Sequence, residues 1–306
     1  MYVITGASGN TGGTAAEVLL AKGEKVRVVG RNPRTLEKFK SRGAQVAIAD
    51  LADPDAFHLT NAFSGATAVY AMIPPDLKSS DGLAYQGVVT KALATALQRA
   101  AVSHVVVLSS VGADKSSGAG PITGLHRLEE QLNGVGGLNT LHIRAGYFME
   151  NLLAQANVIK NVGMTAGPLR GDLKVPMIAA RDIGEYAAER LVKRDFQGNE
   201  ARELLGERDV SYDEVARVIG TAIGKADLSY SQLPAAQLKP ILVQMGMSEN
   251  MAGLILEMAD AMNSGHVKAL EARSPQNTTR TSIEQFIADK FVPLHEGRDE
   301  ERAAHA

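Results

Sequence analysis

The chain has 306 residues, 45% of them hydrophobic, and its 32 basic and 34 acidic side chains give a formal net charge of −2. This length and composition allow a large buried core, in one large domain with an appendage or in two domains. The balanced charge argues against a nucleic-acid binder, and the absence of cysteine excludes disulfides, thiolate zinc sites and a cysteine nucleophile.

No apolar stretch in the sequence is long enough to cross a bilayer. An expected strand begins almost at Met1, which leaves no room for a cleavable signal peptide in the numbered chain. We therefore expect a cytoplasmic protein that contacts neither membranes nor nucleic acid directly. The sequence leaves open a homodimer or a protein partner.

Three glycines stand where the first expected strand, Met1–Thr5, turns toward the first expected helix, Thr14–Lys22. They are Gly6, Gly9 and Gly12, in the string V-I-T-G-A-S-G-N-T-G-G. Such a turn lets the backbone approach a pyrophosphate, while the helix directs its unpaired N–H groups and positive dipole end at the same charge. The strand-turn-helix context favours a dinucleotide site over a chance glycine triplet.

Strands and helices alternate over the following residues. The further expected strands are Lys25–Gly30, Ala44–Ala49, Thr67–Met72, His104–Leu108 and Asn139–Ile143, and the expected helices between them are Pro33–Ser41, Asp53–Phe63, Asp81–Ala100 and Thr123–Asn133. Apolar strands without polar alternation are typical of a parallel sheet that helices cover on both faces. We predict an α/β fold, a doubly wound Rossmann sheet with strand order 3-2-1-4-5-6.

The alternation becomes irregular beyond Gly146. We expect helices at Asn151–Val162, Arg181–Lys193 and Ser211–Ile223, short strands at Glu203–Leu205 and Leu228–Tyr230, methionine-rich helices between Ala235 and Met262, and a loop or hairpin at Gly163–Pro176. Residues 1–153 are expected to form the dinucleotide-binding domain, with 177–195 packing back on it. Residues 154–306 are expected to form a smaller, mostly helical lobe, with 295–306 as a frayed tail.

The helices of this lobe carry a stripe of methionines. It comprises Met245, Met247, Met251, Met258 and Met262. Methionine adapts to irregular gaps, which favours ordinary packing, and the same property suits the wall of a pocket for an apolar substrate.

Arg31 follows the second expected strand, at the place where an acidic residue would suit the free ribose hydroxyl of NAD. Arg34 lies one turn further along, so both guanidinium groups can meet a 2′-phosphate, and no carboxylate competes there. NADP(H) is therefore favoured over NAD(H). The alternative is that both arginines are solvated charges near a helix start. Asp50 and Leu51 close the third strand and can reach the adenine edge, unless Asp50 only caps the next segment.

Six segments together resemble the NmrA-like branch of atypical short-chain dehydrogenase/reductases, which includes bacterial NADPH-quinone oxidoreductases and redox-sensing regulators. The matching segments are Thr5–Gly12, Gly30–Arg34, His104–Ala113, Ile143–Leu153, Ala180–Gly184 and Ser282–Phe286. The resemblance spans nearly the whole chain.

This resemblance implies that NADP(H) binds along the carboxyl ends of the strands. The residues it places at the pyrophosphate are Gly6, Ser8, Gly9, Asn10, Thr11 and Gly12. Those it places along the route to the nicotinamide are the backbone of Ala71, Met72 and Ile73 together with Ser109, Ser110 and Tyr147. With Met72, Ile73 and Phe148, Tyr147 is also a candidate wall for a flat substrate ring, or these aromatics are plain core residues.

Ordinary short-chain dehydrogenases use a Tyr-x-x-x-Lys pair, and none of the seven tyrosines here has a lysine four residues later. The resemblance to the quinone reductases makes His126 a candidate proton donor, with Glu129 or Glu130 as its orienter. A surface histidine in an ion-paired helix fits the same residues equally. His126 and Tyr147 are the candidate catalytic residues, and we expect no metal site.

A quinone tolerates the missing acid, because water can protonate its stabilised reduced form. The sequence thus favours hydride transfer from NADPH to a quinone or a similar activated small electrophile. The alternative is a non-catalytic protein that senses NADP(H) and regulates a partner.

Overall fold

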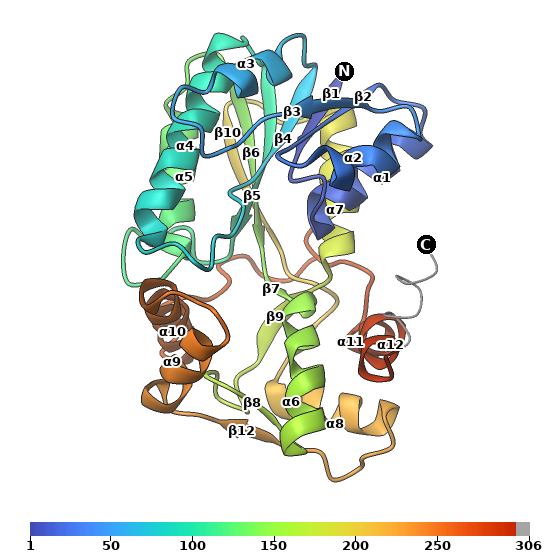
Figure 1. Ribbon diagram of the computed structural model, residues 1–306, viewed down its shortest axis with the longest axis vertical. Helices are drawn as coiled ribbons and strands as arrows, with labels where there is room; N and C mark the ends of the chain where they lie inside the picture. The colour runs from blue at the N-terminus through green and yellow to red at the C-terminus, as the bar shows by residue number, and fades with distance from the viewer. Residues whose placement is uncertain (298–306) are drawn as a thin grey trace.

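The computed structural model describes residues 1–297, and among these a parallel sheet of seven strands has the order β3-β2-β1-β4-β5-β6-β10 (Figure 1). Its strands are β1 (Tyr2–Thr5), β2 (Val26–Gly30), β3 (Gln45–Ile48), β4 (Ala68–Ala71), β5 (His104–Ser110), β6 (Asn139–Ala145) and β10 (Asn199–Leu204). Every neighbouring pair is parallel. The predicted doubly wound sheet and the order of its first six strands are confirmed.

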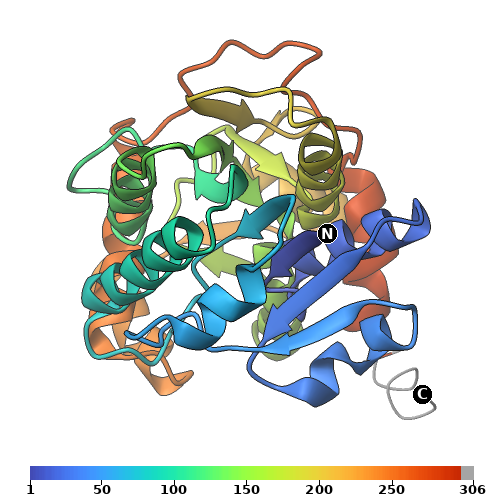
Figure 2. The same cartoon turned by 90° about the horizontal axis from the view of Figure 1, so that it is seen from above.

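Helices cover both faces of this sheet, and the view from above shows the sheet between the two helical layers (Figure 2). One layer contains α1 (Asn10–Ala21), α2 (Pro33–Lys40) and α7 (Ala180–Lys193), and the other α3 (Phe57–Phe63), α4 (Gly82–Arg99) and α5 (Ile122–Asn133). Tyr2 and Ile4 belong to the first core and Val3 to the second. Because alternate residues enter different cores, the strands read as continuous apolar runs.

Two helices begin away from their predicted positions. Helix α1 begins at Asn10 rather than Thr14. Gly12 and Gly13 are therefore part of the helix, and their lack of a side chain lets the helix approach β1 closely. Helix α3 begins at Phe57 rather than Asp53. The Ala56 N–H bonds to the Asp53 carbonyl at 3.1 Å, and Ala56 has a left-handed backbone with φ of 53° that breaks any helix before it.

The strand that the sequence suggested at Glu203–Leu205 is longer and lies elsewhere than expected. It is β10, which pairs with β6 from Asn199 to Leu204 and so forms an edge of the main sheet instead of part of the C-terminal lobe. The preceding helix α7 packs on α1, where a Cβ atom at Gly184 would lie 2.6 Å from the Thr11 carbonyl oxygen.

The remaining elements lie at the carboxyl ends of the main strands (Figure 1). Strands β7 (Tyr147–Phe148), β9 (Val175–Ile178) and β11 (Asp209–Val210) form one small sheet, and β8 (Thr165–Gly167) pairs with β12 (Tyr230–Gln232). The hairpin predicted as one alternative for Gly163–Pro176 is therefore wrong, because β8 and β9 belong to different sheets. A 3-10 turn, Met149–Ala154, replaces the start of the helix expected at Asn151.

The helices of this layer are α6 (Gln155–Val162), α8 (Tyr212–Ala222), α9 (Ala235–Gln244), α10 (Glu249–Asn263), α11 (Ile283–Phe286) and α12 (Val292–His295), with a π-helical turn at Ile287–Phe291. Most of them surround a third core that includes Met149, Val215 and Phe291. Of the expected frayed tail, His295 ends α12, and residues 298–306 lie outside the described residues.

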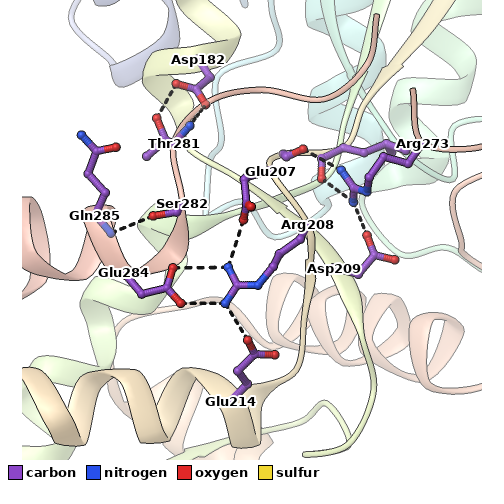
Figure 3. Close-up of polar contacts among 12 residues, drawn as sticks. Asp182, Glu207, Arg208, Asp209, Glu214, Arg273, Thr281, Ser282, Glu284 and Gln285 are labelled. Atoms are coloured by element: carbon purple, nitrogen blue, oxygen red, sulfur yellow. Dashed lines mark hydrogen bonds and ion pairs between the residues drawn. The ribbon is translucent and has the colours of Figure 1, made fainter. Parts of the chain in front are cut away.

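Charged and polar side chains attach the C-terminal segment around α11 to α7 and to the connection between β10 and β11 (Figure 3). Arg208 lies between Glu214 at 2.6 Å, Glu284 at 2.7 Å and Glu207 at 3.0 Å, so one guanidinium joins the β10–β11 connection to α8 and α11. The Thr281 hydroxyl and backbone N–H both donate to the buried Asp182 of α7, at 2.6 and 3.0 Å. These contacts position the helices that face the strand ends.

Candidate active site

The three glycines form a tight turn against the strand that lies next to β1. Gly6 has φ of 62°, and its carbonyl accepts the Gly9 N–H at 2.9 Å. A Cβ atom on Gly6 would lie 2.9 Å from the Met72 sulfur, and one on Gly12 would lie 2.6 Å from the Gly6 carbonyl oxygen. Gly6 is therefore needed for its left-handed backbone conformation, and Gly12 for close packing against backbone carbonyls. At Gly9 the nearest protein atom to a Cβ would be 3.4 Å away, so this exposed glycine leaves room for a ligand instead.

The first turn of α1 is open to an anion. No side chain caps it at Gly9, whereas Asn32 caps α2 and Asp81 caps α4. Unpaired N–H groups at an uncapped helix start attract phosphate. Ser8 and Asn10 are exposed beside this turn, which suits ligand contact.

Thr11 differs from its exposed neighbours. Its side chain is buried, and its hydroxyl oxygen accepts a hydrogen bond from Tyr70 at 2.8 Å. The hydroxyl therefore holds α1 to β4 as an acceptor and keeps its own hydrogen to donate.

Arg31 and Arg34 are exposed beyond the end of β2. Within residues 1–297, neither guanidinium makes a hydrogen bond or an ion pair. Asp50 closes a turn by accepting the Ala52 N–H at 3.0 Å, and Leu51 is buried. The pKa of Tyr85 is raised mainly by burial. The positive charge of Arg31 lowers this pKa, whereas the negative charges of Asp76 and Asp50 raise it, so all three charges lie near Tyr85.

A cavity of about 280 Å³ opens at the carboxyl ends of β4, β5 and β6, and we call it the first cavity. Its lining includes Ile73, Pro74, Tyr85, Gln86, Leu108, Ser109, Ser110, Leu125, Tyr147, Phe148, Asn151, Met251, Ile255 and Met258. Ile73 directly follows Met72, whose side chain contacts Gly6, and Ala71 ends β4 as a fully buried residue. The glycine turn and the cavity are thus connected through three consecutive residues.

Ser109 is part of a buried polar network behind this cavity. Its hydroxyl donates to Glu129 Oε1 at 2.6 Å, and Glu129 receives two further hydrogen bonds from Arg144, at 3.0 and 2.6 Å. The hydrogen bond to Glu129 raises the pKa of Arg144, although burial opposes it. Since the Ser109 hydrogen is committed to Glu129, its oxygen can only accept from a ligand in the cavity.

Tyr147 lines the first cavity, and its hydroxyl oxygen accepts from Tyr212 at 2.8 Å. Burial raises the pKa of Tyr147, and hydrogen bonds with Tyr212 and Asn151 lower it less than burial raises it. The phenol therefore keeps its proton at neutral pH and cannot act as a base there. Ser110, which also lines the cavity, donates its hydroxyl to the Val111 carbonyl at 2.9 Å.

His126 is not among the residues that line the first cavity. Its Nδ1 lies 2.8 Å from the Ala113 carbonyl oxygen and its Nε2 lies 3.4 Å from Glu130, four residues along α5. Of the two carboxylates proposed as its orienter, Glu130 lies beside it, while Glu129 turns to Ser109 and Arg144. The structure thus brings Ser109, Ser110 and Tyr147 together and leaves His126 outside the group.

Several lining residues had no signal of their own in the sequence. Met251 and Met258 reach the cavity from α10, and the methionine stripe was the indication in the sequence that this helix could form a pocket wall. Met245, by contrast, is 70% exposed, so the stripe does not act as a unit.

Within residues 1–297, no helix combines the length and the apolar character needed to cross a membrane. In the same part of the chain, no three His, Asp or Glu side chains are grouped so that they could hold a metal ion.

The family model for the NmrA-like family matches residues 2–296. An NAD(P)H azoreductase of Xenophilus azovorans is 29% identical to the chain over 265 residues, which cover 86% of this chain and 85% of that protein.

Two solved structures share the fold over nearly the whole chain. The NADPH-dependent quinone oxidoreductase QOR2 of Escherichia coli, complexed with NADPH, is 21% identical with a TM-score of 0.76, and the match covers 99% of this chain and 100% of that one. A Citrobacter triphenylmethane reductase complexed with NADP(H) is 19% identical with a TM-score of 0.71, covering 98% and 99%. Since the family model spans almost all described residues, the resemblance is confirmed, and the chain belongs to the NmrA-like family.

Proposed function

We propose that this protein is an NADPH-dependent oxidoreductase that transfers a hydride to a quinone or a similar activated small electrophile. The observation that carries the proposal is the connection between the glycine turn and the first cavity through Ala71, Met72 and Ile73. A nucleotide whose phosphates lie at α1 would place its far end at these strand termini. The family membership and the named reductases support the same class of reaction.

The residues present fit NADP(H). The open first turn of α1 and the space at Gly9 suit the pyrophosphate, and Arg31 and Arg34, exposed and without an ion-pair partner among residues 1–297, suit a 2′-phosphate. Asp50 and Leu51 would lie at the adenine, and Ser8 and Asn10 beside the phosphates. This arrangement supports NADPH as the preferred nucleotide.

The first cavity favours an enzyme over a redox sensor. A sensor can fill the space beyond the nicotinamide, whereas an enzyme needs an open volume there for its acceptor. The cavity of about 280 Å³ lies near the lower end of ordinary ligand pockets, roughly 300 to 1,000 Å³. Its walls include Leu108, Leu125 and Met251, as expected for a flat apolar acceptor.

In the proposed reaction the bound cofactor supplies a hydride from the nicotinamide. The chain's own residues orient the acceptor and exclude water around it, which contributes most of the rate when two flat rings must stack. The Ser109 oxygen, which can only accept, would suit the carboxamide N–H of the nicotinamide rather than a quinone carbonyl, which has no hydrogen to donate. Of the two candidate proton donors, Tyr147 lines the cavity and His126 does not, so the geometry favours Tyr147.

The test is to mix the purified protein with NADPH and a panel of quinones and to follow the loss of nicotinamide absorbance. Turnover that requires both components supports the proposal. Tight NADP binding with no turnover on any acceptor would instead favour the sensor, and no NADP binding at all would reject both.

A further inference from the structure

A second cavity of about 390 Å³ adjoins the first. The residues that line both are Ser110, Ile122, Gly146, Tyr147 and Met258. The second cavity extends beyond them between the β9 and β11 region and the end of α10, along Leu173, Lys174, Val175, Met262, Val267 and Lys268. Tyr147 and Met258 therefore stand at a boundary, with space on both sides.

The volume of the first cavity limits what it can hold. An enclosed space of roughly 150 Å³ accommodates one benzene ring. At about 280 Å³, the first cavity has room for about two rings, which under the proposed function would be the nicotinamide and one ring of the acceptor. A second ring of the acceptor can extend past Tyr147 into the adjoining second cavity.

The two cavities also differ in charge. The first is lined by one charged residue of the described chain, Asp76, whereas the second is lined by Lys174, Lys268 and Asp209. Asp209 is already paired with Arg273. The two lysines are exposed and make no ion pair or hydrogen bond through their ammonium groups within residues 1–297. The second cavity therefore presents uncompensated positive charge beside apolar walls.

We propose that the second cavity is a distal subsite for an elongated acceptor, one that has two aromatic rings and an anionic group, such as a carboxylate or sulfonate, on the ring remote from the nicotinamide. In this arrangement the reacting ring occupies the first cavity, the second ring lies along Met262 and Val267, and Lys174 and Lys268 bind the anion. The inference rests on the proposed function for the identity of the first cavity.

The subsite can be tested by binding alone, with a probe that cannot be reduced. Calorimetry would measure biphenyl-4-carboxylate binding to the NADP+-loaded protein, with benzoate as the short analogue and biphenyl-4-methanol as the uncharged one. We expect biphenyl-4-carboxylate to bind more tightly than either. Lys174→Met and Lys268→Met should each weaken its binding by about three- to tenfold, as for a partly exposed ion pair. Added salt should weaken binding of the carboxylate more than of the alcohol.

Lys25→Met is the matched control, because Lys25 is also exposed but precedes β2 at the opposite end of the strands. It should leave probe binding unchanged. Met262→Trp would fill the second cavity, and it should weaken binding of biphenyl-4-carboxylate but not of benzoate, with retained NADP+ binding as proof that it folds.

Equal affinity in both lysine variants and the parent protein would overturn the subsite, as would competition between the probe and NADP+ for one site. These results do not depend on catalysis. If no acceptor oxidises NADPH, the proposed function fails while the binding data still decide the subsite. If quinones turn over but the lysines leave probe binding unchanged, only the subsite fails.

Discussion

The hydroxyl of Ser109 donates to the carboxylate of Glu129 at 2.6 Å, directly behind the wall of the first cavity. Glu129 is only 5% exposed and is held by two hydrogen bonds from Arg144 on β6. A buried carboxylate needs this compensation. The serine, which resemblance alone would place beside the nicotinamide, is thus oriented by a charge pair contributed by α5 and β6.

The Glu129–Arg144 pair predicts a specific double-mutant cycle. Glu129→Ala and Arg144→Ala should each lower the free energy of unfolding by about 3 to 5 kcal/mol, since each leaves one buried charge uncompensated. The double variant should lose clearly less than the sum, because neither charge remains. Urea unfolding followed by circular dichroism measures all four proteins. Additive losses would show that the two side chains are energetically independent.

Arg31 is predicted to select NADPH. Arg31→Asp should weaken NADPH binding by about tenfold or more, because it removes a charged hydrogen-bond donor and adds a like charge beside the 2′-phosphate. NADH binding should change less. Fluorescence titration with both nucleotides gives the two affinities. Arg42→Asp makes the same charge change at another exposed position after α2 and should leave the NADPH to NADH ratio unaltered. Equal losses for both nucleotides in Arg31→Asp would contradict the assignment.

Substitution of Gly9 should affect nucleotide binding, whereas substitution of Gly12 should affect stability. A Cβ atom at Gly9 would meet no protein atom closer than 3.4 Å, so Gly9→Val should fold but block the approach of the pyrophosphate and abolish binding of either nucleotide. Gly12→Ala would place its Cβ atom 2.6 Å from a carbonyl oxygen and should cost about 1 to 3 kcal/mol of stability.

Thermal unfolding and NADP+ calorimetry of both variants separate the two effects. A Gly9→Val protein that binds NADP+ normally would show that the phosphates do not lie at this turn.

The sequence was sufficient for most of the main sheet because its strands are buried on both faces and therefore strongly apolar. It failed at β10, whose residues read N-E-A-R-E-L. An edge strand pairs on one side only and can carry polar side chains, so its apolar signal is weak. The register of β10 on β6 depends on tertiary pairing over about sixty residues of chain, which local patterns do not report.

The site was predictable where it depends on local backbone and not where it depends on distant side chains. The glycine turn and the arginines after β2 follow from adjacent residues. Two features require knowing how α5, β6 and α10 meet. One is the ion pair between Glu129 and Arg144, and the other is the place of Met251 in the wall of the first cavity. Residues as similar as Glu129 and Glu130 cannot be told apart from spacing alone, although one is buried and the other exposed.

His142 should make the protein sensitive to acid. Its Nε2 lies 2.8 Å from Asn133 Oδ1, while the buried Nδ1 has no partner in the described part of the chain, so the ring is neutral with its hydrogen on Nε2. Burial lowers the pKa of His142 below its ordinary value of 6.5. Because the unfolded chain then binds more protons than the folded one, stability falls as the pH drops below about 6.5.

The slope from one such proton is at most about 1.4 kcal/mol per pH unit. Urea unfolding across this pH range should show it in the parent protein and show a shallower dependence in His142→Gln. An unchanged slope in the variant would assign the acid sensitivity to other groups.

Tyr147 and His126 can be distinguished as proton donors by changing the acceptor. A quinone needs little acid assistance, so Tyr147→Phe should lower kcat by only about tenfold or less. An acceptor such as an azo compound, in which one nitrogen receives the hydride and the other must take a proton, should lose about a hundredfold or more, in the range that general acid catalysis supplies. His126→Ala should show no such dependence on the acceptor. The imidazole of His126 forms a hydrogen bond with the Ala113 carbonyl and does not line the cavity. If His126→Ala reproduced the acceptor-dependent loss and Tyr147→Phe did not, the donor would be the histidine, and α5 would have to turn its side chain toward the cavity during turnover.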